Sequence, residues 1–227
     1  MKKKLGFIFL VLILVIGICF VFYKNNEFNK DDIITKEKGN ITLLKEKYNN
    51  TDIVGVLEIP NVLKTVVVKH SDNEFYLTHN IKKQKDKLGT VFMDYRINLD
   101  SNKVLIYGHN STRGNDLPFV KLDNYVNKKF YLKHPKIYFY SDDGKYEYDI
   151  FSAYVETEDF DYVNLNNYNG LTYLEHINKL KNKSNYDTKV SLDKDSKIII
   201  LQTCNVESGY DGSMKNTLVM GVLKESK

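Results

Sequence analysis

The sequence predicts a mainly β protein, an eight-stranded barrel with a few helices that follows one transmembrane helix. Two features of the chain carry this prediction. An uncharged apolar run near the start is long enough to cross a bilayer. After residue 52, short runs rich in β-branched and aromatic residues alternate with turn residues. Short strands with few long helical patterns between them are typical of a closed or nearly closed β-barrel.

The amino-terminal segment has the pattern of an uncleaved membrane anchor. Three lysines, at positions 2–4, precede the run from Leu5 to Tyr23, which has no charged residue. At ~1.5 Å per residue its length suffices to cross a bilayer core. No small-residue cleavage site follows, and basic residues favour a cytoplasmic amino terminus. We therefore expect residues 1–4 to form a cytoplasmic tail and residues 5–23 a single-pass anchor in the cell membrane. Everything that follows should be extracellular.

Residues 24–51 read as a partly helical stalk. The segment is polar and mixed in charge, and Ile41, Leu43, Leu44 and Tyr48 recur at approximately helical spacing. We expect this face to pack on the base of the domain formed by residues 52–227.

The strands of the predicted barrel begin directly after the stalk. A hairpin turn is predicted at Asp142-Asp143-Gly144. One short helix is expected from Pro118 to Tyr125, and a longer one is marked by Leu171, Leu174, Ile177 and Leu180. The expected strands are Ile53–Ile59, Lys64–Lys69, Thr90–Tyr95, Val104–Tyr107, Lys136–Tyr140, Tyr146–Glu156, Lys197–Thr203 and Thr217–Leu223.

Charge and cysteine content exclude two classes of protein. The formal charge of +4 equals the contribution of Lys24 and the lysines at positions 2–4, so the rest of the chain is balanced. A neutral extracellular part does not favour nucleic-acid binding. Of the two cysteines, Cys19 lies in the apolar run, which leaves Cys204 alone in the remaining chain. Stability must therefore come from an ordinary core and not from disulfides.

Candidate catalytic residues stand at the ends of two predicted strands. Cys204 ends the apolar run from Lys197, and His109 follows the run from Val104 to Tyr107. A free thiol titrates near ~8.5, so a neighbouring imidazole is needed to raise its reactive fraction at neutral pH. A cysteine and a histidine at two strand ends form the arrangement that nucleophilic thiol catalysis requires.

These two segments resemble the signatures of a known family. Tyr107–Asn110 and Leu201–Cys204 are similar to the histidine and cysteine motifs of sortases, the membrane-anchored cysteine transpeptidases of Gram-positive bacteria. Three further segments resemble class B members and follow in family order: Glu58–Asn61, Ser71–Leu77 and Gly89–Arg96. The resemblance spans roughly residues 52 to 223 and implies the sortase-type β-barrel.

The resemblance also implies a reaction. Cys204 would attack a peptide bond in the C-terminal sorting signal of a surface protein and form a thioacyl intermediate, while His109 would protonate the departing amine. Class B members generally favour Asn-Pro-Gln-Thr-Asn over Leu-Pro-x-Thr-Gly signals. The acceptor would be the amine of a peptidoglycan stem peptide or its lipid-linked precursor. No cofactor is expected, and no metal, because the other histidines lack a ligand spacing.

The chain departs from the family at the catalytic arginine. Sortases place an arginine at the start of the strand after the cysteine, yet the only arginines here, Arg96 and Arg113, precede Cys204. Lys215 is the nearest cation in the right region and is the candidate surrogate, although it lacks the planar fork of a guanidinium. The alternative is that Lys215 is a solvated loop lysine and that Arg113 folds back towards the groove.

Substrate contacts are expected from the motif residues Asn110, Gln202 and Thr203. Class B enzymes often have a hydroxyl residue where this chain has Gln202, so the resemblance leaves the signal specificity open. In class B sortases a helix in the position of the longer predicted helix borders the substrate groove, so the preceding segment Phe160–Val163 is expected to contribute to this border, with Tyr162 as a candidate substrate contact.

Three functions remain open at this point. The chain could be an active class B sortase, a sortase-like surface protein that binds peptides without turnover, or a membrane-anchored cysteine peptidase whose acceptor is water. The presence of both Cys204 and His109 favours activity.

Overall fold

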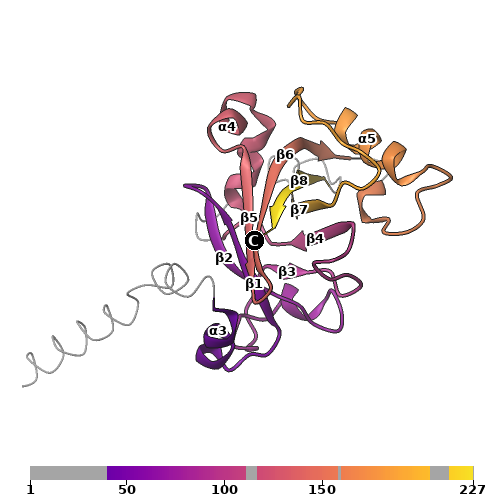
Figure 1. Ribbon diagram of the computed structural model, residues 1–227. Helices are drawn as coiled ribbons and strands as arrows, with labels where there is room; N and C mark the ends of the chain where they lie inside the picture. Colours follow the sequence, from indigo (N-terminus) through magenta and orange to yellow (C-terminus); the bar gives the residue numbers. More distant parts are fainter. Residues whose placement is uncertain (1–39, 111–116, 158–159, 205–214, 227) are drawn as a thin grey trace, which may run out of the picture.

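The computed structural model describes residues 40–110, 117–157, 160–204 and 215–226. Within these residues eight strands close into a barrel in the order β1-β2-β3-β4-β7-β8-β6-β5 (Figure 1). The predicted fold class is confirmed. The strands are β1 (Ile53–Ile59), β2 (Leu63–Val68), β3 (Phe92–Met93), β4 (Lys103–Tyr107), β5 (Lys136–Ser141), β6 (Gly144–Glu156), β7 (Ile198–Cys204) and β8 (Asn216–Ser226).

The pair β4–β7 is parallel and joins segments far apart in the sequence. Lys103 pairs with Ile198 at one end of this pair, and Tyr107 pairs with Gln202 at the other. Residues 198–201 are all fully buried, which is typical of a strand covered on both faces. The parallel register therefore brings the carboxyl ends of β4 and β7 to the same edge of the barrel.

Strand β3 is shorter than the sequence predicts. We expected Thr90–Tyr95, but only Phe92 and Met93 pair as a strand. Directly after Met93 the backbone turns, because the side chain of Asp94 accepts a hydrogen bond from the backbone N–H of Arg96 (2.9 Å). An Asp that bonds the backbone two residues ahead makes a local turn that competes with the β ladder.

The last part of the segment expected to be a partly helical stalk forms helix α3 (Ile41–Tyr48). The Asn40 side chain caps it by accepting a hydrogen bond from the Leu43 N–H. Ile41, Leu44 and Tyr48 are buried in a small second core with residues of β1 and β2. The prediction for Leu43 was wrong, since this side chain is 43% exposed. A period of 3.6 residues turns position 43 away from the face that 41, 44 and 48 share.

The segment after the histidine strand contains two short helices. The predicted helix at Pro118–Tyr125 is a 3₁₀ helix, η2 (Val120–Val126), and α4 (Lys128–Lys133), which was not predicted, follows it. Another 3₁₀ helix, η1 (Phe75–Leu77), lies between β2 and β3. Leu122 and Tyr125 of η2 are buried in the main core, so this segment is packed on the barrel.

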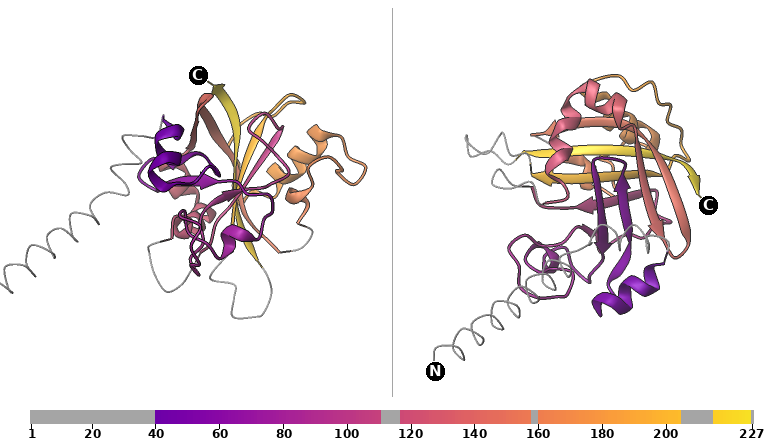
Figure 2. Two further views of the ribbon diagram at one scale, coloured as in Figure 1. Left: turned by 90° about the horizontal axis from the view of Figure 1, so that it is seen from below. Right: turned by 90° about the vertical axis from the view of Figure 1, so that its left-hand side faces the viewer.

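The longer predicted helix is α5 (Tyr173–Asn182), which follows the 3₁₀ helix η3 (Asp161–Val163). Thr172 and Glu175 form a reciprocal capping box at its start, and Leu171 therefore lies outside the helix. Ile177 and Leu180 are fully buried in the main core. Figure 1 and the right-hand view of Figure 2 show α3 and α4 at opposite ends of the molecule.

The predicted tail at 1–4, the anchor at 5–23 and most of the stalk lie outside the described residues. Across residues 40–110, 117–157, 160–204 and 215–226, none of the helices has the length and apolar character needed to cross a membrane.

Candidate active site

His109 follows the end of β4 and is held by a backbone carbonyl. Its Nε2 lies 2.8 Å from the carbonyl oxygen of Leu77 in η1. A carbonyl oxygen only accepts, so Nε2 must carry a hydrogen. The other ring nitrogen, Nδ1, is therefore the atom that can take up and release a proton during a reaction.

Cys204 is the last residue of β7, and its thiol is free and exposed. Two hydrogen bonds fix the end of β7 beside the end of β4: the Gly108 N–H donates to the Gln202 carbonyl (3.1 Å), and the Thr203 hydroxyl donates to the Gly108 carbonyl (2.8 Å). Neighbouring strands lie about 4.8 Å apart. The predicted meeting of the cysteine and histidine strand ends is thus confirmed.

Asn110 joins the two strand ends to η2. Its side-chain nitrogen donates to the Cys204 carbonyl (3.0 Å) and to Oδ2 of Asp123 (2.8 Å). The other oxygen of Asp123 accepts a hydrogen bond from the hydroxyl of Thr217 in β8. The sequence did not single out Asp123, because an acidic residue in a short helix gives no local signal of such contacts. The contact of Asn110 with substrate stays a prediction; in this structure its side chain connects Asp123 to the Cys204 carbonyl.

Gln202 and Thr203 face opposite sides of β7. Side chains alternate along a strand, so Gln202 shares a face with Cys204 and Thr203 does not. Thr203 is fully buried, and its hydroxyl is bonded to Gly108. The prediction that Thr203 contacts substrate is therefore corrected: its placement gives it a structural role. Gln202 is half-buried and keeps the placement expected of a substrate contact.

Tyr162 belongs to η3, and its hydroxyl contacts the first residue of β8. Its hydroxyl accepts a hydrogen bond from the side-chain nitrogen of Asn216 (3.0 Å). Burial raises the pKa of Tyr162 to about 12, and the charges of Glu156 and Cys204 add to this effect. Asn216 was missed by the sequence analysis, which passed over this residue for the adjacent lysine.

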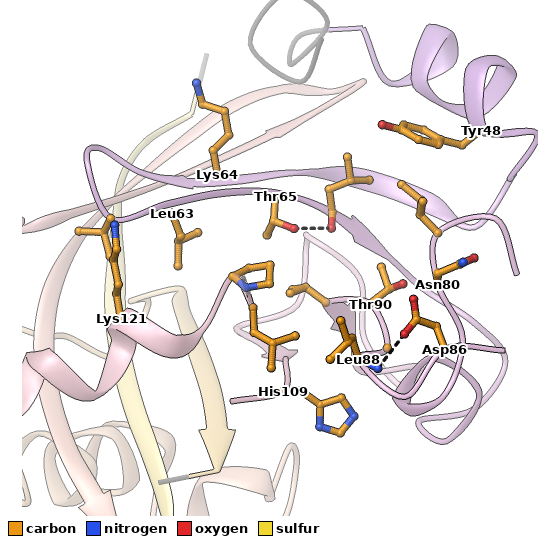
Figure 3. A pocket seen from close by; sticks show the side chains of 17 residues that line it. Tyr48, Leu63, Lys64, Thr65, Asn80, Asp86, Leu88, Thr90, His109 and Lys121 are labelled. Carbon is orange, nitrogen blue, oxygen red and sulfur yellow. Dashed lines mark hydrogen bonds between the residues drawn. The ribbon is translucent and has the colours of Figure 1, made fainter. Parts of the chain in front are cut away.

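A cleft of about 360 Å³ borders His109 (Figure 3). Its walls come from β2, from the segment 80–91 and from the start of η2. Cys204 is not among the residues that line this cleft. Gly89, with φ +60°, lines the cleft, and a Cβ there would lie 2.5 Å from the Tyr76 carbonyl and 3.0 Å from the His109 ring.

Comparison with known proteins identifies this arrangement. The model of the sortase domain matches residues 57–224, which is most of the chain. The chain belongs to the sortase family. It is 33% identical to sortase B of Listeria monocytogenes over 190 residues, covering 81% of this chain and 76% of the relative.

Solved structures agree with this assignment to class B. A Staphylococcus aureus sortase B–substrate complex superposes with a TM-score of 0.72 at 26% identity, covering 86% of this sortase and 91% of that chain. A sortase B complexed with triglycine gives a TM-score of 0.74 at 27% identity, with 86% and 92% covered.

This sortase has no arginine next to Cys204 among the described residues. Arg96 forms two hydrogen bonds with Asp94, Nε to Oδ1 (2.9 Å) and Nη2 to Oδ2 (2.7 Å), so its guanidinium is committed to that carboxylate. Burial would raise the pKa of Asp94, but the hydrogen bonds from Arg96 and Tyr107 lower it below its usual value. Arg113 lies outside the described residues. Lys215 directly precedes β8 and is half-buried, and its role as a surrogate stays a prediction.

Proposed function

We propose that this sortase cleaves the C-terminal sorting signal of surface proteins and transfers them to an amine of the cell wall. The observation that carries the proposal is that the exposed Cys204 ends β7 while His109 follows the end of β4, the strand paired with β7. A nucleophile and a proton-transfer group at one strand edge provide what acyl transfer through a thioester needs.

The reaction has two halves. The Cys204 thiolate attacks the carbonyl carbon of the scissile bond, the C–N bond breaks, and protonated His109 gives a proton to the departing amine. A thioacyl intermediate remains on Cys204. An acceptor amine then attacks this thioester, loses a proton to His109 and displaces the thiolate. Because Nε2 donates to the Leu77 carbonyl, the proton passes through Nδ1.

The proposed substrates follow from the family. The relatives in complex with a substrate and with triglycine support a sorting-signal peptide as donor and a peptide amine as acceptor. We propose an Asn-Pro-Gln-Thr-Asn-like or Leu-Pro-x-Thr-Gly-like signal, and as acceptor a peptidoglycan stem peptide or its lipid-linked precursor. The half-buried Gln202, on the same strand face as Cys204, is proposed to contact the signal.

Peptide turnover tests the proposal. The full chain in detergent is incubated with each signal peptide, with and without an amine acceptor, and the products are analysed by intact-mass spectrometry. We expect an adduct on the wild type that passes to the amine. Cys204→Ala should form no adduct, and His109→Ala should slow its formation by about 10²-fold or more.

Two other outcomes would contradict transpeptidation. Release of the peptide only as the free acid, even with the amine present, would make this chain a peptidase. Peptide binding without any adduct would make it a sortase-like binding protein.

We also propose that residues 5–23 anchor this sortase in the cell membrane, with the barrel outside. The support is the uncharged apolar run preceded by three lysines. Fractionation of cells that express the full chain should recover it with membranes, and protease added to intact cells should digest the barrel. Recovery in the soluble fraction would refute the anchor.

A further inference from the structure

The register of β7 and β8 places one residue opposite the reactive cysteine. Cys204 pairs with Asn216, which is the first residue of β8, and Gln202 pairs with Leu218. Directly opposed residues of an antiparallel pair present their side chains on the same face, with Cβ atoms about 4.5–5.5 Å apart. The Asn216 carboxamide and the Cys204 thiol therefore lie next to each other.

The Asn216 amide has donor capacity beyond its bond to Tyr162. An amide nitrogen carries two hydrogens, and the bond to the Tyr162 hydroxyl (3.0 Å) uses one. That bond also fixes the side-chain orientation, because Tyr162 is itself buried in the main core. A held amide beside the nucleophile is the kind of preorganised donor that stabilises the oxyanion of an acyl-transfer reaction.

The charges around Asn216 are compatible with such a role. On its other side, Asn216 pairs with Glu156 of β6. This carboxylate is 3% exposed and forms an ion pair with Lys183 (2.8 Å), which offsets its negative charge. Tyr162 carries no negative charge that would repel the oxyanion, because burial raises its pKa and keeps its hydroxyl protonated.

Lys215 lies one residue before the start of β8. The register therefore sets Asn216, and not Lys215, opposite Cys204. Asn216, and not Lys215, occupies the start of the strand after the cysteine, which is where sortases are expected to carry their arginine.

We propose that Asn216 is a catalytic residue of this sortase, whose side-chain N–H donates to the oxyanion formed when Cys204 attacks a carbonyl carbon. The proposal rests on the proposed function for its substrate. A neutral carboxamide then takes the place of the family's guanidinium, and Tyr162 holds it in position.

The test compares two reactions of Cys204 that need no sorting signal. With p-nitrophenyl acetate the thiolate attacks a carbonyl, passes through an oxyanion and expels p-nitrophenolate. With iodoacetamide it displaces iodide from a methylene carbon, and no oxyanion forms. Asn216→Ala should lower the ester acylation rate by at least about ten-fold while the alkylation rate stays within about two-fold of wild type. Acylation by a signal peptide should fall by about 10²-fold.

Three further variants sharpen the result. Asn216→Arg restores a stronger donor and should recover ester acylation to the wild-type rate or above. Tyr162→Phe removes the hydroxyl that orients the amide, so it should lower ester acylation in the wild type but not in Asn216→Ala. Asn166→Ala, an exposed asparagine of the loop before α5, is the matched control and should change neither reaction.

The outcomes separate this proposal from the proposed function. Equal losses in acylation and alkylation, or no loss in either, would overturn the role of Asn216, as would a selective loss in Lys215→Ala with Asn216→Ala unaffected. A wild type that turns over no signal peptide, yet shows the selective ester effect, would refute the proposed function and leave the assignment of Asn216 standing.

Discussion

Asp123 is hydrogen-bonded to two of the segments that surround the site. Its two carboxylate oxygens accept hydrogen bonds from Asn110, which follows the histidine, and from Thr217 of β8. Asn110 in turn donates to the Cys204 carbonyl. One carboxylate on η2 thus links Asn110 to β8 directly and, through Asn110, to the end of β7. We infer that it sets the spacing between them and takes no part in the chemistry.

The first prediction concerns this carboxylate. Asp123→Asn removes the negative charge that both hydrogen bonds use, and it keeps both partners only if the Thr217 hydroxyl turns to accept from the new amide nitrogen. Hydrogen bonds to charged groups contribute about 1.5–3 kcal/mol, so we expect the unfolding free energy to fall by about that amount. The kcat for peptide transfer should fall by about ten-fold with little change in KM, because the reacting groups lose their relative position. Urea unfolding and steady-state kinetics measure the two effects.

Asp143→Asn serves as the control. Asp143 is exposed at the turn between β5 and β6, so the same chemical change there should leave stability and kcat unaltered. An Asp123→Asn variant with wild-type kcat would show that the site keeps its geometry without this carboxylate.

Among the elements, the segment from η1 to β3 limits the space around His109. The Leu77 carbonyl accepts a hydrogen bond from the His109 ring, and Gly89 lies against the same ring from the cleft side. The position of the imidazole therefore depends on a loop that contributes nothing to the two strands carrying the reactive residues. Sequence periodicity cannot reveal this dependence, since the contacts join a strand end to a loop.

The second prediction compares two glycines with positive φ. A Cβ at Gly89 would meet the Tyr76 carbonyl at 2.5 Å, whereas a Cβ at Gly170 (φ +86°) would meet nothing within 4 Å. Gly170→Ala should cost only the conformational strain, about 1–2 kcal/mol. Gly89→Ala should cost more and should also lower kcat, because the loop must shift against His109. Thermal unfolding and peptide turnover of the two variants test this, and equal effects would argue against the steric explanation.

Helix α3 illustrates how an element can be predicted while its orientation is not. The spacing of apolar residues indicated a helix, and the structure confirms it over Ile41–Tyr48. The pattern also included Leu43, which the structure leaves exposed. The face that is buried depends on which side meets β1 and β2, and that contact is made by the folded barrel.

On the scale of the whole molecule, the barrel places a second polar cluster at the far end of β4. Lys103, 2% exposed, lies at the opposite end of this strand from His109. Its Nζ is 2.9 Å from Nε2 of His176 in α5 and also donates to the Asn164 carbonyl. Burial lowers the pKa of Lys103 to about 7; the charge of Asp161 opposes this shift, and that of Arg96 adds to it. The cluster ties α5 and the segment before it to the barrel.

The third prediction follows from this pKa. Between pH 7 and the unfolded value of 10.5, the unfolded lysine holds a proton that the folded one lacks. Lys103 therefore makes the unfolding free energy rise with pH across this window, by up to about 1.4 kcal/mol per unit. Lys103→Met lacks this contribution. The unfolding free energy of the wild type minus that of Lys103→Met, measured by urea unfolding, should therefore grow from pH 7 to pH 9.

Lys129→Met provides the comparison, because Lys129 is exposed on α4. The unfolding free energy of Lys129→Met should differ from that of the wild type by the same amount at every pH. If the difference in unfolding free energy between the wild type and Lys103→Met is also independent of pH, Lys103 is charged in the folded protein throughout this range.

The sequence alone determined the fold class, most strand positions and the candidate pair Cys204 and His109. These depend on signals within a few residues: strand patterns, turn residues, and a cysteine and a histidine at strand ends. The tertiary structure decided which residues surround that pair. Asn216 faces Cys204, Asp123 joins Asn110 to Thr217, and Thr203 turns inward because of registers between strands distant in the sequence. A register is set by the summed packing of whole strands, and a shift of one residue would turn every side chain to the other face.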